Sequence, residues 1–293
     1  MPEDIRDKPS IGHEDVVALN FIASRTPYVF RKHFRQGLRS HIMEILDPLD
    51  LQAERAGTLI DGVRWFPKAK PRRMLRIFRS RLPTLAKALN EIQRVKTVER
   101  FLAPDCMATS VECILDYRIA DRWELVLCGF QEYVPGVILD PWAILGETDL
   151  LPSLHDELQG REEETGPDGK AWIDTVRKKG RTFVDRVKRM VAEAGTIPDL
   201  AGAGNLIVTA AGEIRLVDIN NISPVACDGS ISLDEKGYPV GDKSIEALFL
   251  IQEKVAGRPI DRQEGLFKHF FDPVRRKEVK AREALFWKKQ SNA

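Results

Sequence analysis

The sequence predicts an α+β protein of two lobes, an antiparallel sheet with one helix followed by a mainly helical part. Strand-like segments and one amphipathic helix fill most of residues 11–130, whereas longer helical patterns flank a hairpin beyond residue 170. Between them, the run Gln-Glu-Tyr-Val-Pro-Gly at 131–136 breaks both patterns. We therefore expect an N-terminal lobe over residues 1–131 and a C-terminal lobe over residues 132–293.

The composition narrows the class of protein before any motif is read. The chain has 293 residues, and its 45 Lys and Arg nearly cancel its 44 Asp and Glu, which argues against a broad nucleic-acid-binding surface. No apolar stretch approaches the roughly 18 residues of a membrane-spanning helix, and the acidic N-terminus is not a signal peptide. The four cysteines show neither a CxxC pair nor zinc spacing. These features predict a cytoplasmic protein.

The first lobe is expected to open with two strands. The segment Val16–Ile22 is rich in β-forming residues, Pro27 punctuates it, and Tyr28–Phe34 is a second run of the same kind. Proline and glycine then recur through residues 36–83, which predicts an irregular insertion with short helical pieces.

This insertion concentrates positive charge. Residues 62–90 hold nine basic and no acidic side chains, and apolar residues interleave with the basic ones between Arg64 and Arg81. The pattern predicts a short basic amphipathic helix, either a solvated face or a surface for an anionic membrane, an acidic protein or a phosphorylated substrate. Few aromatic residues interleave and no recognition motif occurs, so nucleic acid is not an expected partner.

The rest of the first lobe follows clear periodicities. Leucine, isoleucine and valine recur every three or four residues over 84–102, which predicts an amphipathic helix. The alternating run Ser110–Tyr117 and the apolar run Trp123–Phe130 predict two strands that meet at a turn of Asp121 and Arg122.

The second lobe is predicted to be helices around a hairpin. Residues 171–194 place apolar side chains on one stripe of a long helix, after a solvated loop at 160–169. Residues 206–209 and 214–218 predict a hairpin around Gly212. The remaining expected elements are a second hairpin of 230–233 with 238–240 and helices over 243–256 and 274–289.

The residues that suggest chemistry lie around the first of these hairpins. Asp199 and Asn205 bound a Gly-rich loop, and Asp218 ends the second strand of the hairpin that follows. Because the hairpin folds back on itself, we expect Asn205 and Asp218 to lie side by side. Amide and carboxylate oxygens are hard ligands suited to Mg²⁺, an ion usually shared with phosphate groups.

This arrangement resembles the protein-kinase-like superfamily, which includes protein kinases and the aminoglycoside- and choline-kinase-like phosphotransferases. The 13-residue separation of Asn205 from Asp218 matches the family, and Asp218-Ile219-Asn220 stands where Asp-Phe-Gly is usual. The resemblance implies that Asn205 and Asp218 bind Mg²⁺ and that Asp199 is the catalytic base.

The resemblance extends into the first lobe. Tyr28–Lys32 is similar to the Val-Ala-Ile-Lys of the family's third strand, which implies that Lys32 holds the nucleotide phosphates. Its ion-pair partner on the 84–102 helix would then be Glu91, with Glu99 as an alternative.

The strand Trp123–Phe130 and the break after it are similar to the family's fifth strand and hinge. This implies that the backbone of Glu132 and Val134 meets the adenine of ATP. Of the G-x-G-x-x-G loop that covers the nucleotide, only Gly12 is kept, and Glu14 and Asp15 follow it.

The resemblance therefore implies a kinase-like protein that binds ATP and Mg²⁺ and transfers a phosphoryl group to a protein or small-molecule hydroxyl. Three departures favour the alternative of a weak or inactive pseudokinase that acts as a regulatory or binding module. The glycine loop is incomplete, Ile197-Pro198 replaces the usual His-Arg, and Asp218-Ile219-Asn220 replaces Asp-Phe-Gly. Asp199 also lies one residue further from Asn205 than the family spacing. An unrelated α+β protein with accidental motifs is a third hypothesis.

Overall fold

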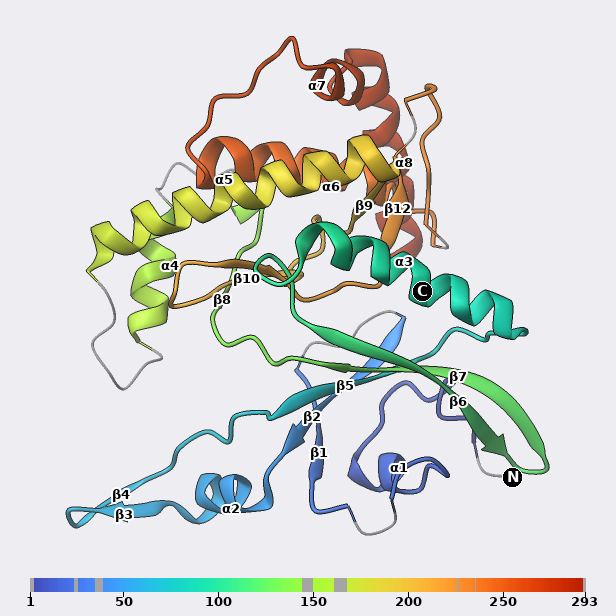
Figure 1. Ribbon diagram of the computed structural model, residues 1–293, viewed down its shortest axis with the longest axis vertical. Coiled ribbons are helices and arrows are strands. Elements are labelled where there is room, and N and C mark those ends of the chain that lie inside the picture. Colours follow the sequence, from blue (N-terminus) through green and yellow to red (C-terminus); the bar gives the residue numbers. More distant parts are fainter. Residues whose placement is uncertain are drawn as a thin grey trace. The chain divides into compact units, whose positions relative to one another are not determined.

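The computed structural model describes residues 3–23, 26–34, 39–143, 150–160, 168–225, 227–234 and 236–291. The architecture is mixed α/β, with an antiparallel sheet and several helices (Figure 1). The chain divides into two compact units. Unit 1 comprises Met1–Gln93 and Thr109–Tyr133, and unit 2 comprises Arg94–Ala108 and Val134–Ala293.

Unit 1 is built on a five-stranded antiparallel sheet with the order β1-β2-β5-β7-β6. The strands are β1 (Val29–Lys32), β2 (Ser40–Leu46), β5 (Arg73–Phe78), β6 (Ser110–Ile119) and β7 (Arg122–Gln131). Strands β6 and β7 pair along their whole length, from Ser110 opposite Gln131 to Ile119 opposite Arg122. This confirms the two strands and the turn that the sequence predicts here.

One face of this sheet carries the apolar core of unit 1. Met43, Leu75, Ile77, Val126 and Cys128 are fully or almost fully buried there, joined by Val16 of helix α1 (His13–Val17). Within β2, β5 and β7 these positions are every second residue, which is the period at which strand side chains share a face.

The opposite face of the same strands buries a polar cluster. Arg76 Nη2 donates to Ser110 Oγ at 3.2 Å and to Glu112 Oε1 at 3.3 Å. The side chains of Arg76 and Glu112 are 3% and 0% exposed. Gly129 lies opposite Arg76 on β7, and a Cβ there would approach Nη2 to 3.2 Å, so glycine leaves room for the guanidinium. A charge buried this deeply needs its carboxylate partner, because an uncompensated buried charge is strongly destabilising.

The prediction of a strand at Val16–Ile22 is wrong, since α1 covers His13–Val17 and turns follow it. The start of this helix explains the difference. Gly12 N donates to Asp15 Oδ2 at 2.8 Å, which is half of a capping box, and Lys8 pairs with Asp15 at 2.6 Å. A satisfied helix start here outweighs the β propensity of the valines.

The prediction of an irregular insertion at 36–83 with a basic helix is also wrong. This stretch supplies β2 and β5, which are inner strands of the sheet, and α2 (Pro48–Ala56) with the hairpin β3 (Thr58–Ile60) and β4 (Val63–Trp65) between them. Met74 to Phe78 are buried on both faces of β5, so the polar alternation that marks a half-exposed strand is missing.

Helix α3 (Leu85–Leu102) confirms the helix predicted over 84–102, and it begins in unit 1 and ends in unit 2. Its last two turns bury Val95, Val98, Phe101 and Leu102 in the core of unit 2.

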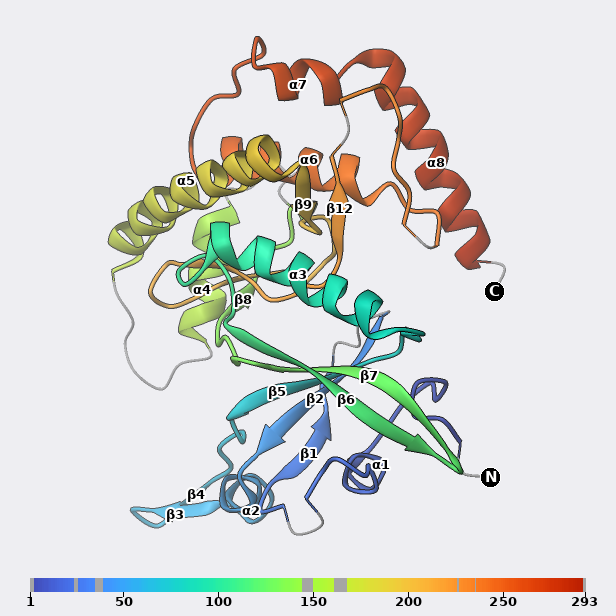
Figure 2. The ribbon, with the colours of Figure 1, turned by 45° about the vertical axis from the view of Figure 1, so that its right-hand side comes forward.

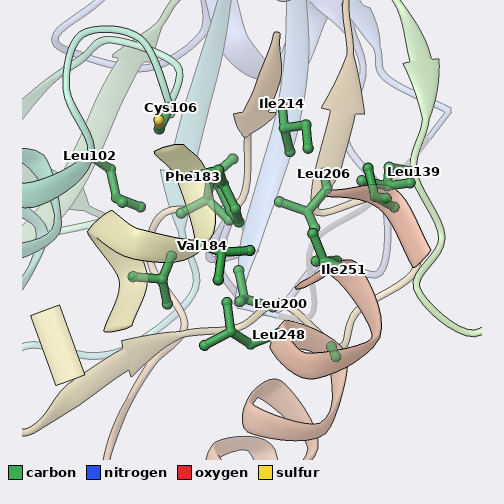
Figure 3. Packing of buried hydrophobic residues seen from close by; sticks show 14 of the residues in the cluster. Leu102, Cys106, Leu139, Phe183, Val184, Leu200, Leu206, Ile214, Leu248 and Ile251 are labelled. Carbon is green, nitrogen blue, oxygen red and sulfur yellow. The ribbon is translucent and has the colours of Figure 1, made fainter. Parts of the chain in front are cut away.

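Unit 2 surrounds a short sheet, β8 (Val137–Ile138), β10 (Leu206–Val208) and β11 (Ile214–Leu216), with helices. Its core contains Phe183 and Val184 of the long helix α5 (Gly169–Ala194), packed with Leu206 and Ile214 of the sheet (Figure 3). The other elements are α4 (Leu150–Gln159), β9 (Thr196–Pro198), β12 (Ile222–Pro224), α6 (Val240–Leu250), the π-helical turn η2 (Ile251–Val255), α7 (Gly265–Phe270) and α8 (Pro273–Ser291).

The long helix, the hairpin around Gly212 and the C-terminal helices are confirmed. The second predicted hairpin is wrong, because no described residue of 230–233 or 238–240 is in a strand. Instead Asp234 Oδ1 accepts from Tyr238 N at 2.8 Å, and Val240 begins α6. Of the loop predicted at 160–169, residues 161–167 lie outside the described residues. No described helix is long and apolar enough to cross a membrane.

Candidate functional site

The candidate site is the loop from Asp199 to Asn205, which lies in unit 2 between β9 and β10. Both ends of the loop are fixed by strand pairing. Before it, β9 pairs with β12, and Asp199 N donates to Asn221 O at 2.7 Å. After it, β10 pairs with β11, and Val217 N donates to Asn205 O at 2.8 Å. Asn205 therefore lies opposite Val217, and Asp218 is the residue after Val217 in the sequence.

The Asp199 carboxylate is buried and held by three hydrogen bonds. Its side chain receives N–H donors from Ala201 at 2.9 Å and Gly202 at 3.1 Å on Oδ1, and from Asn221 Nδ2 at 3.0 Å on Oδ2. A carboxylate offers about four lone-pair sites, so one acceptor position stays available on Oδ2. This position is what a substrate hydroxyl would need.

The charge state of Asp199 is tuned by its surroundings. Burial, followed by the nearby charge of Asp218, raises the pKa of Asp199 to about 6, against the lowering effect of its three donors. A carboxyl with a pKa near the working pH suits general-base catalysis better than an ordinary surface aspartate does.

The side chain of Asn205 is oriented by the loop that it ends. Its Nδ2 donates to the main-chain oxygen of Asp199 at 2.9 Å, which identifies the other amide atom, Oδ1, as the one left to accept or to ligate. Gly202 is what permits this orientation. A Cβ on Gly202 would lie 2.4 Å from Asn205 Nδ2 and 2.9 Å from Oδ1.

Asp218 follows β11 and is partly exposed, and Asn220 N donates to its Oδ1 at a long 3.4 Å. Nearby, Asn220 Oδ1 is buried and has no hydrogen-bond donor among the described residues. A buried acceptor without a donor is commonly satisfied by a bound ion or by ordered water.

These donors fit Mg²⁺. Asn205 Oδ1 and the Asp218 carboxylate would supply one amide and one carboxylate oxygen, and Mg²⁺ typically takes its other ligands from phosphates and water. In the described ranges, no three His, Cys, Asp or Glu side chains gather as a metal cluster.

Replacement of Gly202 by alanine should disturb this site selectively. The new methyl group has to displace the Asn205 amide, which removes its hydrogen bond to Asp199 and turns Oδ1 away. We expect a loss of about 1–3 kcal/mol in stability, comparable with other overpacking changes, and weaker metal-dependent nucleotide binding.

Thermal unfolding and titration with Mg²⁺ and ATP check this expectation. Gly265→Ala is the matched control, because a Cβ at Gly265 meets nothing within 4 Å. If Gly202→Ala behaved like Gly265→Ala in both measurements, the role given to the glycine would be wrong.

The residues predicted in unit 1 are placed as follows. Lys32 lies at the end of the edge strand β1, exposed and opposite Met43, and Glu91 is half-buried on α3. Among the described residues, no ion pair joins the two side chains, although Glu91 does have another interaction partner. Gly12 caps helix α1 and does not link two strands. The connection between β1 and β2 includes residues 35–38, which lie outside the described ones.

The predicted hinge residues lie where the chain passes from unit 1 to unit 2. Glu132 is tied to Thr109, whose N and Oγ both donate to Glu132 Oε2 at 3.0 Å. Val134 is 9% exposed and packs with Ala108 and Ile207 in unit 2.

Sequence reasoning missed three contributors to the Asp199 loop. Asn221 holds the carboxylate, Ser244 Oγ accepts from Leu200 N at 3.1 Å, and Tyr238 lies close enough for the Asp199 charge to raise its pKa, after burial and Glu283. Asn221 directly follows the Asp-Ile-Asn motif, which is the one signal that could have indicated it. The other two are distant in sequence and carry no local pattern.

The burial of Arg76 was also not indicated by the sequence. Along the chain β5 directly precedes α3, and Arg76 is a buried cation of that strand.

No family model matches this chain, and no curated protein matches it. Among solved structures, the chain is similar to one described as "ROP18 kinase domain in complex with AMP-PNP and sucrose". The identity is 9%, the alignment covers 90% of this chain and 83% of that chain, and the TM-score is 0.37. A likeness of this size identifies neither the fold nor the function of the chain.

Proposed function

We propose that the chain is a divergent kinase-like phosphotransferase that binds ATP with Mg²⁺ and transfers the γ-phosphoryl group to a hydroxyl acceptor. One observation carries the proposal: the hydrogen bond from Asn205 Nδ2 to the Asp199 carbonyl. This bond ties the Asn205 amide to the main chain of Asp199, and the hairpin places Asn205 opposite Val217, the residue before Asp218. The proposal takes Asp199 as the base and Asn205 with Asp218 as the metal ligands. Phosphoryl transfer requires such a set because its catalysis is mainly positioning and charge neutralisation.

Each side chain of the loop has one role in this proposal. Asn205 and Asp218 hold Mg²⁺, which would neutralise charge on the phosphates when it is bound. Asp199 accepts the hydrogen bond of the acceptor hydroxyl at the open position of Oδ2 and orients or deprotonates it. The raised pKa of Asp199 supports this role, since a proton taken near neutral pH returns readily to solvent.

Unit 1 offers an exposed cation for the nucleotide phosphates. Lys32 is exposed at the sheet edge, and Glu91 is proposed to orient it. For Gly12, Glu132 and Val134, contact with the nucleotide stays a prediction from the resemblance. Loss of ATP affinity in Lys32→Met, with unchanged unfolding, would support the role of Lys32, and unchanged affinity would remove Lys32 from the nucleotide site.

A binding module without turnover is the second candidate, and one observation favours it. Three of the four acceptor positions of the Asp199 carboxylate are already used within its own loop. An aspartate that only braces a loop would show the same bonds.

Transfer of a labelled γ-phosphate from ATP, measured with Mg²⁺ and again with the metal chelated, tests the proposal. We expect Mg²⁺-dependent release or transfer of the label. Mg²⁺-dependent ATP binding without turnover would support the binding module instead. The absence of both would overturn the kinase-like assignment.

A further inference from the structure

The hairpin β3–β4 exposes an unusual number of apolar side chains. It projects with α2 from the end of the sheet of unit 1, in both views (Figures 1 and 2). Every large apolar residue of its tip is more than half exposed, from 52% at Ile60 to 63% at Leu59. We call this set the apolar tip: Leu59, Ile60, Val63, Trp65 and Phe66.

The two faces of the hairpin carry different side chains, and both faces are exposed. Leu59 pairs with Arg64, and the Arg64 side chain folds over the end of α2, where Nη1 donates to Ala56 O at 2.7 Å. The opposite face carries the pairs Thr58–Trp65 and Ile60–Val63. Since strand side chains alternate between faces, Ile60, Val63 and Trp65 point together away from α2.

Positive charge lies directly behind the apolar tip. Lys68, Lys70, Arg72 and Arg73 follow it and are exposed, while Asp61 is the one acidic residue between Gly57 and Arg73. Arg72 reaches Asp47 at 3.3 Å, and no ion pair within the described part of the chain engages Lys68, Lys70 or Arg73.

The other basic residues of this region serve the fold. Arg76 is buried, Arg79 Nε donates to Arg6 O at 2.9 Å, and Arg81 pairs with Asp7 at 2.6 Å. The positive surface is therefore the short stretch beside the apolar tip, and it does not extend along β5.

We propose that this hairpin docks on an anionic lipid surface, with the apolar tip in the headgroup region and the adjacent Lys and Arg residues against acidic headgroups. Exposed Trp, Phe and Leu flanked by Lys and Arg is the combination that interfacial membrane segments use. Each cation near an anionic leaflet adds attraction that acts within about a Debye length.

A lipid surface fits this geometry better than an acidic protein. The hairpin is a narrow two-stranded ribbon with five exposed apolar side chains, whereas a standard protein interface buries roughly 800 Å² per partner. A bilayer needs no complementary shape, so a projecting ribbon can enter it.

Sedimentation with lipid vesicles tests this proposal on the full chain. Vesicles of phosphatidylcholine alone are compared with vesicles of phosphatidylcholine and phosphatidylserine in equal parts. We expect binding to the mixed vesicles only, weakening as salt is raised. The double variant Trp65→Ser with Phe66→Ser should lower the partition coefficient by about tenfold or more, because each side chain loses its burial in lipid.

Two further variants sharpen the result. Lys68→Ala with Lys70→Ala should weaken binding about tenfold at low salt and little at high salt. Trp123→Ser is the matched control, because Trp123 is 61% exposed on β7 and Trp65 is 56% exposed. Thermal unfolding and ATP binding measured on each variant separate loss of docking from loss of fold or of the nucleotide site.

Equal vesicle binding by the wild type and the Trp65–Phe66 variant would overturn the proposal. The proposal would also be overturned if Trp123→Ser lost as much vesicle binding as the Trp65–Phe66 variant. Failure of the wild type to bind mixed vesicles would also overturn the proposal. If the protein were then retained on immobilised polyglutamate, an acidic protein would be the favoured partner.

Discussion

Asp218→Ala is expected to remove phosphoryl transfer while leaving unit 2 folded. The substitution deletes the only carboxylate proposed to hold Mg²⁺, and loss of one such charge-stabilising group commonly lowers kcat by about 100-fold or more. The fold should survive because Asp218 is partly exposed and its one described hydrogen bond, from Asn220 N, is long at 3.4 Å. Its removal should also lower the pKa of Asp199, since the Asp218 charge is one cause of the raised value.

The measurement is Mg²⁺-dependent turnover of ATP, with Asp174→Ala beside it. Asp174 is an exposed carboxylate of α5 in the same unit, so the control changes the net charge equally. Equal turnover in wild type, Asp218→Ala and Asp174→Ala would remove Asp218 from the chemistry.

Asp199→Asn should lower turnover and raise stability, because it removes the proposed catalytic base together with the buried charge. The amide oxygen can still accept from Ala201 N and Gly202 N, and the Asn221 amide can turn to present its oxygen. Turnover should fall by about 10²–10⁴-fold, which is the usual contribution of a general base.

Stability should change in the opposite direction, and its sign follows from the raised pKa. A carboxyl whose folded pKa is about 6 and whose ordinary value is 3.8 stabilises the fold while protonated. This contribution is complete below pH 3.8 and is lost as the pH rises through 6, a difference of roughly 3 kcal/mol.

The asparagine variant carries no such titration. The free energy of unfolding of the variant, minus that of the wild type, should therefore grow as the pH rises between about 4 and 6 and then level off. Denaturant unfolding at a series of pH values measures this difference. A difference that stays flat with pH would mean that Asp199 is not the buried, proton-binding group described.

The fold was predictable where one periodicity dominates a long segment. The amphipathic patterns of α3 and α5 and the alternation in β6 were enough to predict those elements from local sequence alone. Prediction failed at β5 because the charge of Arg76 reads as exposed from sequence alone. Its partner Glu112 is 36 residues away, and only the sheet register brings the two together.

For the candidate site, the predictable part was local. Asn205 and Asp218 flank one hairpin, and its register places Asn205 opposite Val217, the residue before Asp218. The place of Lys32 depends on which strands flank β1, and a single segment does not carry that information. The function of Gly202 was hidden as well, since it depends on where the Asn205 amide lies.

The cation site of Asn205 and Asp218 is measured most directly by binding of Mn²⁺ with a non-hydrolysable ATP analogue, read by electron paramagnetic resonance. This measurement needs no turnover, so it applies to an active kinase and to a binding module alike. We predict that wild type and Asp174→Ala immobilise Mn²⁺ in the presence of the analogue. Asp218→Ala and Asn205→Ala should each weaken that binding by about tenfold or more. Equal immobilisation of Mn²⁺ by all four folded proteins would contradict the site.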